Sequence, residues 1–100
     1  MREEKLLAYL KGACSGKQRT AKSADLEHVI GISGTDLRKF VNALRRKGIP
    51  IASSKDGYFY AVTAGEVYAT IRQLKTMVKG LEAAIHGLEQ SLDQFGPGTG

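Results

Sequence analysis

Side chains that can hydrogen-bond to nucleic acid recur along residues 33–46. Apolar residues repeat between them at steps of three and four, which places them on one face of a helix: Leu37, Phe40, Val41 and Leu44. The other positions share polar groups: Ser33, Thr35, Arg38, Lys39 and Asn42. Arg and Lys can donate to guanine, Asn can pair bidentately with adenine, and Thr can touch a thymine methyl group. The spacing therefore predicts a helix with one buried face and one face suited to reading DNA.

Further cations extend this candidate surface. Three of them close the same segment, Arg45-Arg46-Lys47, and although cations stabilise helix C-termini, three in a row exceed that need. We expect at least one of them to contact a phosphate, as we do for cations in a hairpin turn and in an early loop. The predicted DNA-binding set thus gains five members: Arg45, Arg46, Lys55, Lys17 and Arg19.

The distribution of charge agrees with this set. Residues 1–48 hold eleven Lys or Arg against five Asp or Glu, a net charge of +6. Residues 49–62 hold one of each, and residues 63–100 hold three against four. The positive field therefore belongs to the N-terminal half, which would attract a polyanion.

Other chemistries find no support in the sequence. No nucleophile with a base, no paired carboxylates and no phosphate loop can be assembled, so we predict neither an enzyme nor a cofactor. The lone Cys14 and the distant His28 and His86 lack the spacing of a zinc site, so no metal is predicted. A charged N-terminus and the lack of an apolar run of about 18 residues predict a cytoplasmic protein without a membrane span.

Short helices would have to position the polar face. Residues 2–11 place Leu6, Leu7 and Leu10 at helical spacing, which predicts a first amphipathic helix that Gly12 ends. A basic loop over residues 13–22 follows, with a short strand near residues 19–21.

A second helix is predicted over residues 24–30. Its apolar face would consist of three residues: Leu26, Val29 and Ile30. Ser23 would cap its N-terminus and a left-handed Gly31 would end it. Ser33 then caps the third helix, the one with the polar face, and Gly48 stops it.

Two strand-like runs, 49–53 and 58–62, flank an Asp-Gly turn that is typical of a β-hairpin. Lys55 would lie at its tip. Tyr58 and Tyr60 alternate with Phe59, and we assign these aromatic residues to packing.

A pattern of residues extends across the second helix, the third helix and the hairpin. It consists of Leu26 to Ser33, then Leu37, Val41 and Leu44, then Arg45 to Ile51, and finally Gly57-Tyr58. This pattern resembles the winged helix-turn-helix domain of the biotin-repressor type. It is also similar to small phage and prophage proteins that join such a domain to a C-terminal helix. The resemblance implies a DNA-reading third helix and a hairpin wing. Glu27 departs from it, because a small residue is usual there, and either the helix crossing is splayed or Glu27 tilts outward.

A long helix is predicted to follow, because Thr63-Ala64-Gly65-Glu66 forms a capping box. Its first turns, with Val67, Tyr68 and Ile71, would cover the first helix. Beyond them an unbroken heptad pattern predicts a dimer interface: Ile71, Leu74, Val78, Leu81, Ile85, Leu88 and Leu92. Mostly β-branched residues at position a with Leu at d favour a parallel pair, an antiparallel pair would set Lys75 opposite Glu89, and a higher-order bundle is also permitted.

The predicted fold class is mainly α with a small β-hairpin: a winged helix-turn-helix domain over 1–62, a coiled-coil dimerisation helix over 63–94 and a disordered tail over 95–100. The predicted function is sequence-specific double-stranded DNA binding as a homodimer, in transcription regulation or as a replication accessory of phage type. The alternative is a winged-helix adaptor that binds protein and not DNA.

Overall fold

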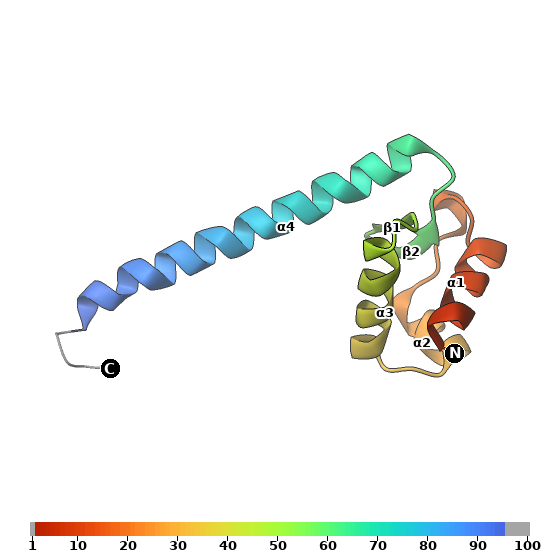
Figure 1. Ribbon diagram of the computed structural model, residues 1–100, viewed down its shortest axis with the longest axis horizontal. Coiled ribbons are helices and arrows are strands. Elements are labelled where there is room, and N and C mark those ends of the chain that lie inside the picture. The colour runs from red at the N-terminus through yellow and green to blue at the C-terminus, as the bar shows by residue number, and fades with distance from the viewer. Residues whose placement is uncertain (1, 96–100) are drawn as a thin grey trace. The chain divides into compact units, whose positions relative to one another are not determined.

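The computed structural model describes residues 2–95, which contain four α-helices, two short 3-10 helices and one β-hairpin. The predicted mainly helical architecture, with a small two-stranded hairpin and a long C-terminal helix, is confirmed. The chain divides into two compact units, Met1–Thr70 and Ile71–Gly100 (Figure 1). Each unit is described by itself below.

The first helix, α1, spans Arg2–Ala13 and buries Leu6 and Leu10 completely. The predicted span of 2–11 ends two residues before the observed end at Ala13. The backbone amide of Cys14 still donates to Leu10 O at 3.0 Å, which continues the helical ladder past the glycine. Gly12 is therefore an interior helix residue.

The helices α2 (Ser23–Ile30) and α3 (Gly34–Arg46) are joined by a tight turn at Gly31. Gly31 adopts the predicted left-handed conformation, with φ of 78°, and its amide donates to Glu27 O at 2.8 Å. The predicted Ser23 cap is wrong, because α2 already begins at Ser23 and the flanking Lys22 makes no side-chain cap. The predicted place of Val29 in the apolar face of α2 is also wrong, because Val29 is 41% exposed.

The core of the N-terminal unit lies between α1, α2, α3 and the hairpin (Figure 1). The six largest side chains buried below 2% exposure come from the three helices: Leu6, Leu10, Leu26, Leu37, Val41 and Leu44. Burying each aliphatic side chain contributes about 1.5–3 kcal/mol, so this interior holds the outward face of α3 in place.

The hairpin consists of β1 (Ile51–Ser54) and β2 (Gly57–Tyr60), paired antiparallel with Ile51 opposite Tyr60. The predicted strands at 49–53 and 58–62 are each displaced by one or two residues. At the turn, the last residue pair of the hairpin is Ser54 with Gly57. At the other end, Pro50 has no backbone N–H to donate, and its carbonyl accepts from Ala61 N at 2.9 Å. Phe59 enters the core, while Tyr58 and Tyr60 are half-buried beside it.

The segment 14–21 runs along the other edge of β2. Tyr60 N donates to Cys14 O and Gly16 N donates to Tyr60 O, and a second bridge pairs Ala21 with Tyr58. The predicted strand at 19–21 is thus reduced to the single Ala21 bridge, because Lys17–Arg19 forms a 3-10 turn.

The long helix α4 spans Ala64–Ser91, and its first turns belong to the N-terminal unit. The capping box forms as predicted, with Glu66 N donating to Thr63 Oγ1 at 3.2 Å and Thr63 N donating to Glu66 Oε1 at 3.2 Å. Val67 packs on the core. Tyr68 is 64% exposed, so the prediction that it covers the first helix is wrong.

Thr70 is 5% exposed and attaches α4 to the hairpin. Ser53 N donates to Thr70 Oγ1 at 3.1 Å, and the Thr70 hydroxyl donates to Glu66 O at 3.2 Å. The Ser53 amide and the buried Thr70 hydroxyl therefore each have a hydrogen-bond partner.

The C-terminal unit is the remainder of α4 followed by a short 3-10 turn, Leu92–Gln94. No helix within residues 2–95 has the length and apolarity needed to span a bilayer. Most of the predicted tail, residues 96–100, lies outside the described part of the chain.

Candidate nucleic-acid interface

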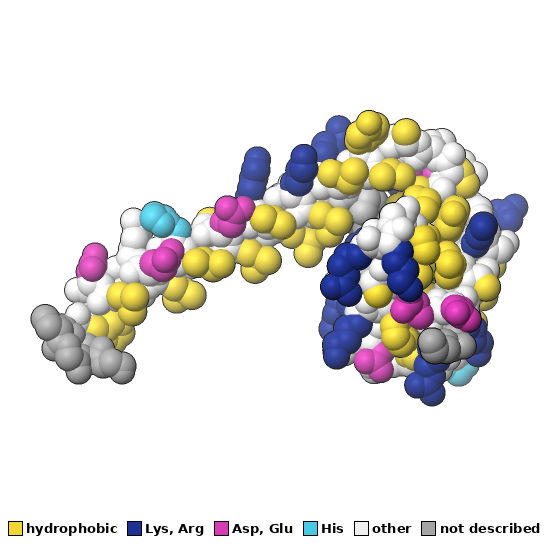
Figure 2. All heavy atoms as spheres, viewed as in Figure 1, with side chains coloured by type: hydrophobic (Ala, Val, Ile, Leu, Met, Phe, Trp, Pro, Cys, Tyr) yellow, Lys and Arg dark blue, Asp and Glu magenta, His cyan; other side chains and the backbone are white. Residues whose placement is uncertain are grey.

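The outward face of α3 carries the polar side chains singled out from the sequence. Four of them are exposed: Thr35, Arg38, Lys39 and Asn42. The opposite face buries Leu37, Val41 and Leu44 to 2% exposure or less. Lys and Arg side chains gather along the α3 edge of the N-terminal unit (Figure 2). Because the helix is held by its apolar face, this polar face is fixed to a rigid scaffold.

The N-terminus of α3 is capped by Ser33, whose Oγ accepts from Asp36 N at 3.1 Å. Ser33 remains exposed, so its hydroxyl hydrogen is available to an external acceptor such as a phosphate. Glu27 of α2 reaches this end of α3, because a Cβ placed on Gly34 would stand 3.4 Å from both of its carboxylate oxygens. Glu27, which replaces the small residue usual at this position, is thus accommodated because Gly34 opposite it has no side chain. The negative charge of Glu27 lies near the positive end of α3.

Arg45 turns toward the hairpin and away from the outward face. Its Nε donates to Ile51 O at 2.8 Å and its Nη2 donates to Ser53 Oγ at 3.2 Å, while the guanidinium lies 6.0 Å from the Tyr58 ring centre. Burial lowers the pKa of Arg45 from its ordinary value. Arg45, expected from its position to contact phosphate, is therefore a packing residue that joins α3 to β1, and we leave it out of the candidate surface.

Of the two cations that follow Arg45, Lys47 forms an ion pair within the chain and Arg46 is exposed. Lys47 Nζ lies 2.7 Å from Glu3 Oε1, which links the end of α3 to the start of α1. Of the three consecutive cations, Arg46 is thus the one that adds to the surface of α3.

Lys55 lies in the two-residue hairpin turn and is exposed, as the sequence predicts. The turn is held by Asp56 N, which donates to Ser54 Oγ at 3.2 Å, and by Gly57 with φ of 138°. A Cβ on Gly57 would stand 1.9 Å from Ala21 O. Only glycine fits there, so the position of Lys55 depends on Gly57.

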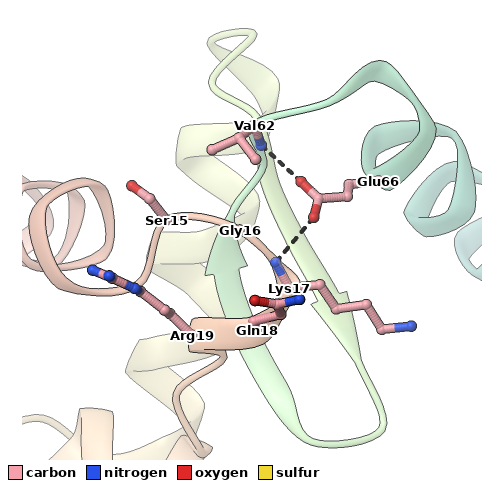
Figure 3. A pocket seen from close by; sticks show the side chains of 7 residues that line it. All are labelled: Ser15, Gly16, Lys17, Gln18, Arg19, Val62 and Glu66. Carbon is pink, nitrogen blue, oxygen red and sulfur yellow. Dashed lines mark hydrogen bonds between the residues drawn. The ribbon is translucent and has the colours of Figure 1, made fainter.

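The loop with Lys17 and Arg19 is held by the carboxylate of Glu66. Glu66 Oε2 accepts from Lys17 N at 2.9 Å, and Oε1 accepts from Val62 N at 2.7 Å (Figure 3). These bonds, that of Val62 first, lower the pKa of Glu66 below its usual range. Both cationic side chains are exposed, and they point away from Glu66 in different directions (Figure 3). The loop therefore presents its cations outward and does not bring them together.

The apolar side of α4 beyond Thr70 is uncovered in the chain as it stands. All seven residues predicted for a dimer interface are between 36% and 69% exposed: Ile71, Leu74, Val78, Leu81, Ile85, Leu88 and Leu92. Met77 and Phe95 add two more exposed apolar side chains. Figure 2 shows these hydrophobic side chains as a stripe along one side of the helix. Such a stripe is too large to be ordinary surface and marks an interaction face.

Two supporting residues were not recognised from the sequence. Thr70 falls within the range 63–94 predicted as a coiled-coil helix, but it binds the hairpin. The sequence predicts Glu66 only as a cap of α4, whereas it also holds the 15–19 loop. A Thr among apolar helix positions is the one signal that could have indicated a buried hydroxyl at Thr70. The second role of Glu66 left no local signal, because Lys17 is 49 residues away.

Within residues 2–95, no group of three His, Cys, Asp or Glu side chains lies close enough to hold a metal ion. Burial raises the pKa of the Cys14 thiol, which keeps it protonated and disfavours reaction. No protein-family model, curated protein or solved structure matches this chain.

Proposed function

We propose that the protein binds double-stranded DNA sequence-specifically through a winged helix-turn-helix domain and acts as a homodimer joined by α4. In this proposal α2 and α3 are the helix-turn-helix, α3 enters the major groove and the β1–β2 hairpin is the wing. The role is that of a transcription regulator or a replication accessory of phage type. The major groove is wide enough for one α-helix, and its base edges match the donors of α3.

The observation that carries the proposal is the composition of the exposed face of α3. Arg38, Lys39 and Arg46 are exposed there together with Asn42, whereas the acidic Glu27 is half-buried between helices. Arg38 and Lys39 supply donors for guanine, and Asn42 can pair with adenine. Lys55 in the wing adds a phosphate contact that positions the domain without reading sequence.

The proposal of a homodimer rests on the apolar stripe of α4. A helix whose apolar side chains are this exposed gains free energy by burying them, at about 25 cal/mol per Å². A second copy supplies an identical stripe of matching length. A dimer would also double the number of α3 helices presented to DNA, which suits an operator with two half-sites.

The decisive experiment is selection of bound sites from a random duplex pool by the full chain, followed by fluorescence anisotropy on the enriched site. We expect one enriched motif and an affinity that falls steeply with salt. Arg38→Ala should cost about 1–3 kcal/mol of binding on the enriched site and relax the preference at one base position. Lys55→Ala should weaken binding to all sequences alike and reduce the salt slope by about one.

Lys5→Ala is the matched control, because Lys5 is an exposed cation on α1 and lies outside the proposed interface. Its effect should be smaller than that of Lys55→Ala. Lack of binding at low salt would reject the proposal and favour an adaptor that binds another protein. Binding without any enriched motif would reject sequence specificity.

A further inference from the structure

The charged side chains of α4 beyond Thr70 are separated by sign along the helix. The first half carries only cations, and the second half and the turn after it carry only acids: Arg72, Lys75 and Lys79, then Glu82, Glu89 and Asp93. All six are exposed. The macrodipole of an isolated helix favours the opposite order, with acids near the N-terminus and cations near the C-terminus. The order of charges therefore does not serve the isolated helix.

A second copy that runs in the opposite direction makes use of this order. The cationic half of each helix then lies beside the acidic half of the other, whereas a parallel pair sets like halves beside one another. We propose that two copies of α4 pair antiparallel, which gives the dimer of the proposed function, on which this inference rests, a defined direction.

The apolar positions define a register for this pair. Ile71 meets the partner's Leu88, Leu74 meets the partner's Ile85, and Val78 meets the partner's Leu81. All six residues are exposed in the single chain, at 36% or more, and all six become buried in this register. Each layer combines a position a residue with a position d residue, which is the arrangement of antiparallel pairs.

The flanking positions select the same direction. In the antiparallel register, Lys75 lies on the same flank as the partner's Glu82 and Glu89 and between their two levels, and each contact occurs twice by symmetry. In a parallel pair the residues opposite Lys75, Glu82 and Glu89 are neutral: Thr70, Met77 and Ala84. Charge complementarity across the interface thus arises in the antiparallel pair and not in the parallel one.

The charges also select between antiparallel registers. Sliding the helices by one heptad so that Val78 meets the partner's Leu88 would set Glu82 beside the partner's Glu89, twice, and move Lys75 away from the partner's Glu82. In the proposed register one like-charge contact remains, that of Glu82 with its own copy. The two Lys75 side chains, each between two acids of the partner, outweigh it.

The direction of pairing decides where the two DNA-binding units are attached. In the proposed register the two Thr70 residues are about 28 Å apart along the helix axis, at 1.5 Å per residue. In a parallel pair they would be side by side. The antiparallel dimer thus separates the attachment points by a distance on the order of the roughly 34 Å turn of B-DNA.

Disulfide trapping of the full chain tests the direction. Leu74→Cys and Ile85→Cys are made singly and together, and the unchanged chain is the control, because its lone Cys14 is buried. Antiparallel pairing predicts covalent dimers for the double variant and none for either single variant. Each single cysteine would lie about 16 Å from its own copy along the axis, too far for a disulfide.

Charge exchange gives a second measurement, in which sedimentation equilibrium determines the dimer dissociation constant. Lys75→Glu and Glu89→Lys should each raise that constant, the first roughly tenfold, whereas Glu89→Lys added to Lys75→Glu should lower it again. Lys79→Glu is the matched control, since it changes the same charge away from the Lys75 flank and should have a smaller effect.

The outcomes separate this inference from the proposed function. Covalent dimers of either single variant would show parallel pairing and overturn the inference while the homodimer stands. A non-covalent dimer that no variant traps would overturn the register. A chain that sediments as a monomer would overturn both the inference and the homodimer of the proposed function.

Discussion

The carboxylate of Glu66 accepts a hydrogen bond from the backbone amide of Lys17 at 2.9 Å, across 49 residues of sequence. Its other oxygen accepts from Val62 N and Thr63 N at the start of α4. One side chain therefore completes a helix cap and also fixes the loop that carries two of the candidate phosphate contacts. The start of α4 and the early loop are coupled through this carboxylate.

The Glu66 contacts should make stability depend on acid pH. Backbone donors lower the pKa of Glu66 in the folded chain, so its contribution is complete above the ordinary pKa of a glutamate. The contribution is lost as pH falls through the lowered value. Urea unfolding across the acid range should show a loss that Glu66→Gln reduces, because Gln does not titrate. An unchanged pH dependence in Glu66→Gln would contradict this role.

Gly57 should be intolerant of any side chain. Its φ of 138° is outside the range that residues with a Cβ adopt easily, and the added Cβ would stand 1.9 Å from Ala21 O. Gly57→Ala should cost at least about 2 kcal/mol of unfolding free energy in urea titrations and break the bridge between Ala21 and Tyr58.

Gly12→Ala is the matched control for that measurement. Gly12 lies inside α1 with open space around it, so the added methyl group should stabilise the chain by about 0.5–1 kcal/mol. Equal effects of the two substitutions would contradict the argument from backbone conformation.

Thr70 should contribute to the stability of the fold through its hydroxyl group and not through the shape of its side chain. Thr70→Val removes the acceptor of Ser53 N and leaves that amide without its partner, at a cost of about 1–3 kcal/mol. Thr70→Ser keeps the hydroxyl and should cost less. Urea unfolding measures the difference, and hydrogen exchange of the Ser53 amide should speed up in the Val variant. Equal stability of the two variants would show that the hydroxyl is dispensable.

The sequence predicts those features of the fold that depend on residues close together in the chain. The Ser33 cap, the left-handed Gly31 and the box of Thr63 and Glu66 all formed as predicted, since each depends on residues within four positions of one another. The polar face of α3 is exposed because its buried face repeats at the helical period.

Contacts between distant segments could not be predicted in this way. Arg45 was grouped with Arg46 by sequence, but the Ile51 carbonyl and Ser53 hydroxyl capture it once β1 packs on α3. Glu27 departs from the small residue that is usual at its position, but Gly34 lies opposite it and leaves room for its carboxylate. In both cases the neighbour that decides the position of the side chain comes from another element, so spacing along the chain contained no information about it.

Arg45 and Arg46 are consecutive residues of α3 whose substitution should separate folding from binding. Arg45→Ala removes two hydrogen bonds to β1 and should lower the unfolding free energy by about 1–2 kcal/mol. Arg46→Ala changes an exposed side chain and should alter stability by less than about 0.5 kcal/mol.

In DNA-binding assays under conditions where both variants are folded, Arg46→Ala should have the larger effect and Arg45→Ala the smaller one. Arg46→Ala should weaken binding to every sequence and reduce the salt slope by about one, as expected for a phosphate contact. Arg45→Ala should retain the salt slope, because its guanidinium is held against the hairpin. A reduced salt slope for Arg45→Ala would show that this side chain leaves β1 to contact DNA, and would return it to the candidate surface.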